Sequence, residues 1–333
     1  AVLYEPTSGE FLYLQNADER LPMASTTKIM TALVALRECP DLTRTVTVDS
    51  RAVGIEGSSA YFKGGEQYTL YDLLCIMMLR SANDAACQVA LTVSDDIDAF
   101  ALLMNDTAAE LSLQNTSFTN PSGLDNENHY SSARDLALLT AEAMKYEVFC
   151  DIVSKKSYTA TELSTGKEQV FVNHNKLLSA YDGCIGVKTG YTKRSGRSLV
   201  SAAERDGLRL IAVTINAPDD WNDHKRLLDF GFSVREYKKL ASVDDISAPL
   251  PLVNSNKEYI SIKPARDFYA VIERGAKTEL YYDLPNYVIA PISVGEAVGK
   301  IKIYSNGKFI GELELVASEG AEKHKTILER IKR

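Results

Sequence analysis

The chain has 333 residues, of which 45% are hydrophobic and 25% are charged, and its formal net charge is -8. This length predicts one large domain with a smaller one appended, and the composition is that of a globular protein with a sizeable core. The acidic balance argues against a nucleic-acid-binding protein, which needs a basic face to meet phosphates.

Cysteine and histidine usage excludes the common metal motifs. The five cysteines are odd in number and mostly lie in apolar runs, so we expect buried thiols rather than a disulfide framework. No H-E-x-x-H motif occurs, and we predict no metal and no cofactor, because the four histidines are far apart in the chain: His129, His174, His224 and His324. No apolar stretch reaches the roughly 18 residues that a membrane span needs.

The first half of the chain is predicted to be mostly helical after an opening hairpin. Apolar residues at 2–4 and 11–14 flank a polar turn, which predicts two paired strands. A helix is expected to begin near Ser25, because apolar residues recur at near-helical spacing through residues 26–36. Further helices are predicted at residues 70–79, 84–93, 97–111 and 133–145.

Strands return in the second half of the first domain. They are predicted at residues 170–172, 185–189, 198–201 and 210–213, and a helix is predicted near residues 223–229. Asp206-Gly207, between the last two strands, is typical of a hairpin turn. Strands before and after a helical middle favour an α+β fold, in which both ends of the domain enter one antiparallel sheet flanked by helices.

Beyond about residue 237 the composition changes to short β-rich runs separated by prolines. Residues 300–304 and 309–316 flank Asn306-Gly307, which predicts a hairpin within a small all-β module. We place this module at residues 241–318, after a first domain at 1–240. Residues 319–333 are predicted to be a polar helical tail, too weakly apolar to anchor a protein alone, and a possible lead-in to a membrane anchor.

The first candidate site is the S-x-x-K motif Ser25-Thr26-Thr27-Lys28. Residues three apart share one helix face, so the Lys28 amine can reach the Ser25 hydroxyl. A serine becomes a strong nucleophile when a base takes its proton, and a lysine can do this if burial or a nearby cation lowers its pKa. By itself, the motif also describes an N-cap serine followed by an exposed lysine.

Two further motifs follow in order. Ser81-Ala82-Asn83 interrupts an apolar helical run, where it either caps the next helix or relays a proton and binds a substrate backbone. Lys188-Thr189-Gly190 lies on a predicted strand, where the first two residues can bind a carboxylate and the glycine lets a peptide lie close. The conjunction and order of the three motifs, rather than any one of them, indicate a serine acyl-transfer enzyme.

With these motifs the chain resembles the serine D-alanyl-D-alanine carboxypeptidases, the low-molecular-mass penicillin-binding proteins. Residues 16–31, 118–124 and 182–190 resemble that family closely. The resemblance covers residues 1–240 well and residues 241–318 more loosely, and it implies a penicillin-binding/β-lactamase-like transpeptidase fold. It also implies an exported protein at the outer face of the bacterial cytoplasmic membrane, and the start at Ala1 without a methionine is interpreted as a removed signal or a trimmed chain.

The resemblance implies an acylation and deacylation cycle on peptidoglycan stem peptides that end in D-Ala-D-Ala. Ser25 would attack the carbonyl between the two D-alanines, Lys28 would take its proton, and Ser81 with Lys188 would deliver a proton to the departing D-alanine. β-Lactams would acylate the same serine.

Substrate binding is implied for four more residues. Backbone N–H groups of Ser25 and Tyr191 would hold the oxyanion. The terminal carboxylate would meet Thr189 and Lys188, with Gly190 giving room, and Asn83 would bind the peptide backbone.

Two departures from the family pattern concern the carboxylate end of the site. Tyr191 stands where many relatives carry histidine, and His174 falls where some relatives place an arginine. His174 is equally well explained as part of an exposed polar turn. Arg194 and Arg197 are candidates to assist the carboxylate, or are surface charges.

Other functions fit parts of the pattern. A class A β-lactamase shares the Ser-Lys pair, but it would be one domain with a glutamate for deacylation, and its middle motif is S-D-N rather than S-A-N. A non-catalytic β-lactam sensor would need only an acylated serine. The β-rich module either binds a partner or lifts the active site off a membrane.

Overall fold

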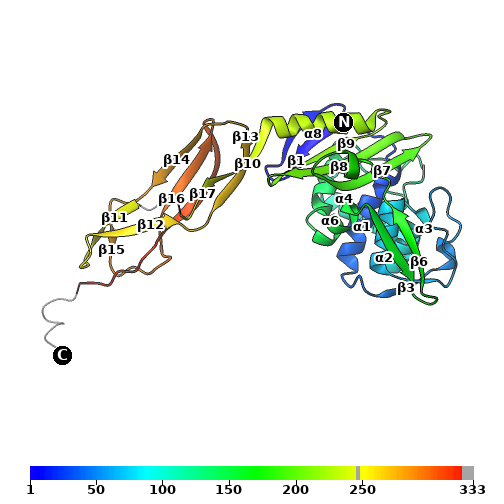
Figure 1. The fold of residues 1–333 in the computed structure, drawn as a ribbon, viewed down its shortest axis with the longest axis horizontal. Coiled ribbons are helices and arrows are strands. Elements are labelled where there is room, and N and C mark those ends of the chain that lie inside the picture. Colours follow the sequence, from blue (N-terminus) through cyan, green and yellow to red (C-terminus); the bar gives the residue numbers. More distant parts are fainter. Residues whose placement is uncertain (245–247, 325–333) are drawn as a thin grey trace. The chain divides into compact units, whose positions relative to one another are not determined.

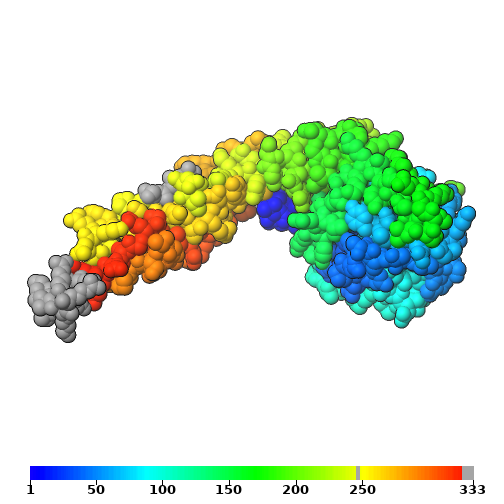
Figure 2. All heavy atoms as spheres, turned by 60° about the horizontal axis from the view of Figure 1, so that its bottom comes forward, coloured from blue at the N-terminus to red at the C-terminus, as the bar shows by residue number. Residues whose placement is uncertain are grey.

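The computed structural model describes residues 1–244 and 248–324. The chain divides into two compact units, Ala1–Phe232 and Ser233–Arg333. Figure 1 colours the first unit from blue to yellow-green and the second from yellow to red. Figure 2 shows the same colours on the atoms, with the undescribed residues in grey. Among the described helices, none combines the length and apolar character needed to cross a bilayer.

A five-stranded antiparallel sheet in the order β2-β1-β9-β8-β7 organises the first unit. The N-terminal hairpin joins this sheet because Val2 pairs with Val213. Asp206 and Gly207 turn β8 into β9 with φ angles of 50° and 80°, which confirms the predicted hairpin. The strands are β1 (Val2–Glu5), β2 (Glu10–Leu14), β7 (Cys184–Thr192), β8 (Gly196–Arg205) and β9 (Leu208–Thr214).

Helices cover both faces of this sheet (Figure 1). On one face lies α8, whose buried His224 contacts Ser201 of β8 and Thr214 of β9. The other face packs against α5 and α6, so the predicted α+β architecture is confirmed. The helices are α1 (Lys28–Glu38), α2 (Leu70–Arg80), α3 (Asn83–Val93), α4 (Ile97–Glu110), α5 (Ala133–Ala143), α6 (Glu147–Ser154), α7 (Leu177–Ala180) and α8 (Asp220–Val234).

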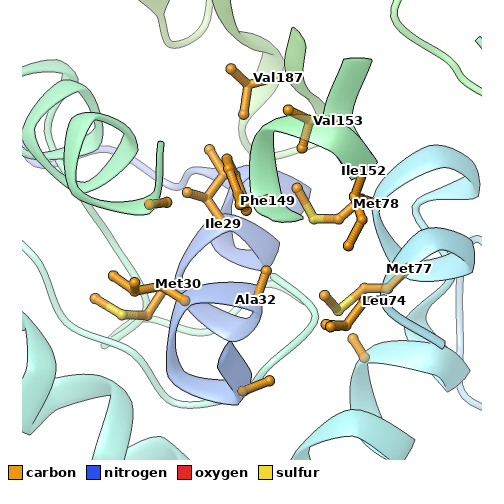
Figure 3. Close-up of a cluster of buried hydrophobic side chains, with 14 of the residues drawn as sticks. Ile29, Met30, Ala32, Leu74, Met77, Met78, Phe149, Ile152, Val153 and Val187 are labelled. Carbon is orange, nitrogen blue, oxygen red and sulfur yellow. The ribbon is translucent and has the colours of Figure 1, made fainter. Parts of the chain in front are cut away.

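The core of the first unit is built around α1, in which every residue from Lys28 to Leu36 is buried. A helix that is apolar on nearly all sides must be enclosed by other elements. Figure 3 shows Ile29 of α1 in a cluster with Phe149 of α6 and Val187 of β7. Each fully buried side chain of this size contributes about 1.5–3 kcal/mol, so the helix that carries Lys28 is held firmly in place.

Shorter elements complete the helical layer. Residue Thr69 opens α2 with a capping box to Asp72, in which each side chain accepts from the other's backbone N–H. The helix α6 was not predicted, because its eight residues are too few to show a clear period. The short elements are η1 (Ala24–Thr27), η2 (Ser50–Ala52), β3 (Thr45–Thr47), β4 (Gln67–Thr69), β5 (Ser157–Glu162) and β6 (Lys167–Val172).

The second unit is β-rich, as predicted. It contains a six-stranded sheet in the order β14-β16-β17-β12-β11-β15 and the pair β10-β13. Asn306 and Gly307 turn β16 into β17 with φ angles of 47° and 77°, confirming this hairpin as well. The strands are β10 (Arg235–Ala241), β11 (Ala248–Val253), β12 (Tyr259–Pro264), β13 (Phe268–Glu273), β14 (Thr278–Asp283), β15 (Val288–Ile289), β16 (Ala297–Ser305) and β17 (Lys308–Ala317).

The predicted helical tail falls partly outside the described residues, at 325–333. Its described part is not helical, because Ala321 pairs with Ile292 in an isolated β-bridge.

Candidate active site

Ser25 lies on η1, a short 3-10 turn that leads directly into α1. The sequence predicted that the helix begins near Ser25, whereas the α-helix starts three residues later, at Lys28. The hydroxyl of Thr26 donates to the carbonyl of Met23 at 2.7 Å, and the hydroxyl of Thr27 donates to the carbonyl of Ala24 at 2.8 Å. The two residues between the serine and the lysine therefore hold the carbonyls that precede the serine.

The Lys28 amine is fully buried and lies among three oxygen atoms. Its Nζ is 3.0 Å from Ser25 Oγ, 2.7 Å from Asn83 Oδ1 and 2.5 Å from the carbonyl oxygen of Ser122. A neutral amine has two N–H groups and one lone pair. Because Asn83 Oδ1 and the Ser122 carbonyl can only accept, they take both N–H groups and leave the lone pair for the Ser25 hydroxyl.

Burial and a neighbouring cation favour this neutral amine. Desolvation lowers the pKa of Lys28 well below its ordinary value, and the positive charge of Lys188 lowers it further. Lys188 is also buried, and desolvation lowers its pKa to about 7. A lysine of the third motif thus helps to keep the lysine of the first motif neutral.

Ser81 and Asn83 lie between α2 and α3. Ser81 ends α2 in the left-handed conformation with φ 62° and ψ 29°. The N-cap of α3 is Ala82, which makes no side-chain capping hydrogen bond, so the interpretation of this motif as a helix cap is wrong. The Nδ2 of Asn83 donates to the Glu56 carbonyl at 2.6 Å, which turns its Oδ1 toward Lys28.

A buried carboxylate secures the loop beside Asn83. Asp84 accepts from the Ser59 hydroxyl at 2.6 Å and from the backbone N–H groups of Ala60 and Tyr61. The Asn83 N–H donates to the carbonyl of Ser58 at 2.7 Å. These contacts, which no short motif indicated, hold one wall of the site in place.

The third motif lies on β7, the edge strand of the sheet. The Lys188 Nζ donates to the Thr189 carbonyl at 3.0 Å. A Cβ on Gly190 would lie 3.0 Å from the Met23 carbonyl oxygen and 3.2 Å from the Ser25 nitrogen. A larger residue here would require β7 or η1 to shift by a few tenths of an ångström, so glycine suits this close approach.

A cleft of about 300 Å³ lies along this edge and brings together residues of all three motifs. Ser25, Ser81, Thr189, Gly190 and Tyr191 line it, and Tyr191 is 66% exposed. Lys28, Asn83 and Lys188 lie in the buried surroundings. The remaining lining residues are Ser58, His174, Lys176, Arg197, Asp220 and Trp221.

Arg197 reaches the cleft from β8, with its guanidinium held by two contacts. Its Nε and Nη2 donate to Oδ1 of the buried Asp220 at 3.0 and 2.9 Å. Its guanidinium carbon lies 5.7 Å from the ring centre of Trp221. Arg194, the other candidate for the carboxylate, is exposed and does not line the cleft.

His174 is exposed and lies outside helices and strands, as the interpretation as a polar turn expects, and it also lines the cleft. Its Nε2 lies 3.1 Å from Nη1 of Arg80. Burial lowers the pKa of His174, and the charges of Lys188 and Arg80 lower it further. The ring is therefore a neutral polar group at this end of the cleft.

Both units match known families. A family model described as D-alanyl-D-alanine carboxypeptidase matches residues 1–219, and one described as penicillin-binding protein 5, C-terminal domain, matches residues 236–323. The chain is 32% identical to D-alanyl-D-alanine carboxypeptidase DacF of Bacillus subtilis, covering 97% of this chain and 85% of that one. It is 33% identical to DacC of Escherichia coli, covering 97% and 84%.

Solved structures show the same likeness. Penicillin-binding protein 5 from Haemophilus influenzae aligns over 97% of this chain and 96% of its own, with 29% identity and a TM-score of 0.71. The Streptomyces K15 DD-transpeptidase aligns over 70% of this chain and 96% of its own, with 34% identity and a TM-score of 0.66.

Proposed function

The chain belongs to the D-alanyl-D-alanine carboxypeptidase family, and on that premise we propose that Ser25 is its nucleophile and Lys28 the base that activates it. As a serine-type carboxypeptidase it removes the terminal D-alanine of peptidoglycan stem peptides. The arrangement around Lys28 carries the proposal, because two fixed carbonyl acceptors leave the lone pair of a neutral amine facing the Ser25 hydroxyl.

In the acylation step, Ser25 Oγ attacks the carbonyl carbon between the two D-alanines while its proton passes to Lys28. The backbone N–H groups of Ser25 and Tyr191 stabilise the oxyanion, a contribution of about 3 kcal/mol for one such donor. The tetrahedral intermediate then collapses with cleavage of the C–N bond. Ser81 and Lys188 deliver a proton to the leaving amine, and water later hydrolyses the acyl-enzyme.

The substrate backbone and carboxylate are assigned to the two walls of the cleft. Asn83 uses one Nδ2 hydrogen on the Glu56 carbonyl, so its second hydrogen is free to bind a substrate carbonyl. Thr189, Gly190 and Lys188 provide the carboxylate end. Arg197 is the cation that assists there, because Asp220 fixes its guanidinium beside the cleft.

β-Lactams are proposed to acylate Ser25, because they imitate the acyl-D-Ala-D-Ala amide. A β-lactamase is less well supported: among the described residues that line the cleft there is no glutamate to drive rapid deacylation, and the acid present, Asp220, is engaged by Arg197. We place the enzyme at the outer face of the cytoplasmic membrane, with a peripheral membrane association.

The test uses a diacetyl-Lys-D-Ala-D-Ala peptide with the wild-type protein and a Ser25→Ala variant, with fluorescent penicillin labelling alongside. D-Alanine release and labelling that both vanish in the variant support the proposal. Labelling without release points to the sensor function. A folded wild-type protein that shows neither signal contradicts the mechanism.

A further inference from the structure

A buried histidine outside the three motifs contacts Thr27 of the first motif. His129 is 3% exposed, and its ring lies edge-on to Phe118. Its Nε2 is 2.8 Å from the hydroxyl oxygen of Thr27, and its Nδ1 is 3.0 Å from the backbone nitrogen of Thr119. The catalytic cycle described above uses neither contact.

The hydrogen bonds around this ring run in one direction. The Thr119 N–H can only donate, so Nδ1 accepts and the proton of a neutral ring sits on Nε2. Thr27 Oγ1 donates its own proton to the Ala24 carbonyl at 2.8 Å, so it accepts from Nε2–H. The chain of donors therefore runs from Thr119 through His129 and Thr27 to the Ala24 carbonyl.

The end of this chain is the peptide group that contains the Ser25 N–H. A trans peptide is planar, with its C=O and N–H on opposite sides, so an anchored Ala24 carbonyl also fixes the direction of the Ser25 N–H. Ala24 is a strained residue, because its φ of 49° is positive. The hydrogen bond to its carbonyl therefore helps to hold an unfavourable backbone conformation.

Two glycines pack closely against the same peptide group. A Cβ on Gly123 would lie 2.0 Å from the Ala24 carbonyl oxygen, and one on Gly190 would lie 3.2 Å from the Ser25 nitrogen. Backbone therefore packs against both ends of the group. The hydroxyl of Thr27 adds a side-chain hydrogen bond to the carbonyl of this group.

We propose that His129 is a positioning residue for the oxyanion site: through Thr27 it holds the Ala24 carbonyl and so aims the Ser25 N–H at the developing oxyanion. This inference rests on the proposed function of Ser25. Oxyanion donors act by being fixed before the charge develops, so a small rotation of this peptide lowers the acylation rate without removing any group that contacts substrate.

The charge state of the ring agrees with this geometry. Burial lowers the pKa of His129 to about 4, and the positive charge of Lys28 acts in the same direction. The ring is therefore neutral near pH 7 and keeps one donor and one acceptor nitrogen.

The test compares two pairs of variants by acylation rate, KM and inhibition by a boronic acid. His129→Phe keeps the ring but removes the donor, and Thr27→Val removes the hydroxyl that links the ring to Ala24. His129→Gln and Thr27→Ser retain a donor and a hydroxyl and serve as rescues. The boronic acid bonds to Ser25 Oγ as its proton passes to Lys28, and the tetrahedral anionic boron requires the oxyanion donors.

We expect the acylation rate and the boronate affinity to fall together, by about 10- to 100-fold in Thr27→Val and about 10-fold in His129→Phe, with KM within about twofold. The rescue variants recover most of the loss. His224→Phe is the matched control, because His224 is equally buried and also contacts hydroxyls through both ring nitrogens, those of Ser201 and Thr214.

The inference would be overturned if stability and acylation rate fell equally in His129→Phe and His224→Phe while boronate affinity stayed unchanged. Failure of the proposed function is recognised separately, by a wild-type protein that releases no D-alanine or a Ser25→Ala variant that still does.

Discussion

Polar groups are used differently around Lys28 and on the β16-β17 hairpin of the second unit. Around Lys28, buried polar atoms meet partners that come from distant parts of the chain, such as Asn83 and Ser122. On the hairpin, most of the buried positions are apolar, as at Ile301 and Leu313, and Lys300 and Glu312 pair on the exposed side. The contacts around Lys28 set the protonation and direction of one amine, whereas the pattern on the hairpin keeps one face of a sheet buried and the other face in contact with water.

The largest loss of activity is expected from a change at Lys28. A Lys28→Met variant keeps the length and apolar stem but removes the proton acceptor, so we expect kcat/KM for the D-Ala-D-Ala peptide to fall by about 10²–10⁴. Circular dichroism serves as the folding control. Activity within tenfold of wild type in a folded variant would assign the base to another residue.

The next effect concerns pH and Lys188. Its folded pKa of about 7 lies below the ordinary value of a lysine, 10.5, so between these values the unfolded chain binds more protons and stability rises with pH. From pH 7 to 9 the wild type should gain about 2–3 kcal/mol of unfolding free energy relative to Lys188→Met. Urea denaturation of both proteins at the two pH values measures this gain. Parallel curves for the two proteins would show that Lys188 stays charged in the fold.

A smaller effect, on KM, is expected from a change at Arg197, which lines the cleft and pairs with Asp220. An Arg197→Leu variant loses the cation proposed for the substrate carboxylate, and we expect KM to rise about tenfold with kcat changed little. Arg194→Leu is the matched control, because Arg194 is exposed and outside the cleft lining. Equal KM values in the two variants would place Arg197 among the structural residues.

The smallest effect belongs to the hairpin of the second unit. Lys300 pairs with Glu312 at 2.7 Å on the exposed side of the sheet, where solvent screens the pair. A Lys300→Ala variant should therefore show no measurable change in denaturation midpoint or in D-alanine release. A clear loss of either would mean that this face of the β-module takes part in more than maintaining the sheet.

Local sequence patterns predicted the elements with strong local signals. The helix at residues 70–80 follows from its apolar period, and Asp206-Gly207 and Asn306-Gly307 mark their turns directly. The order of the three motifs also indicated which residues gather at one site. The helix, the two turns and each single motif lie within about a dozen consecutive residues, which is why one sequence suffices to find them.

The parts that escaped prediction depend on contacts across the chain. No local pattern indicated the left-handed backbone of Ser81. Nor did one indicate that Asp84 anchors a loop through Ser59 or that His129 contacts Thr27, because these partners are far apart in the chain. Two adjacent threonines in the first motif gave a hint, since threonine hydroxyls often bond back to carbonyls three residues earlier. The pairing of Arg197 with Asp220 had no signal beyond the charges themselves.

The central sheet has a consequence for how the protein is made. Because β1 lies between β2 and β9, one edge of β1 stays unpaired until Val213 of β9 is available to pair with Val2. Such a long sequence separation slows folding and leaves an unpaired edge while the chain is incomplete. During synthesis the sheet closes only after β9 has emerged, so a chain cut before residue 208 cannot complete the strand order that contains β7.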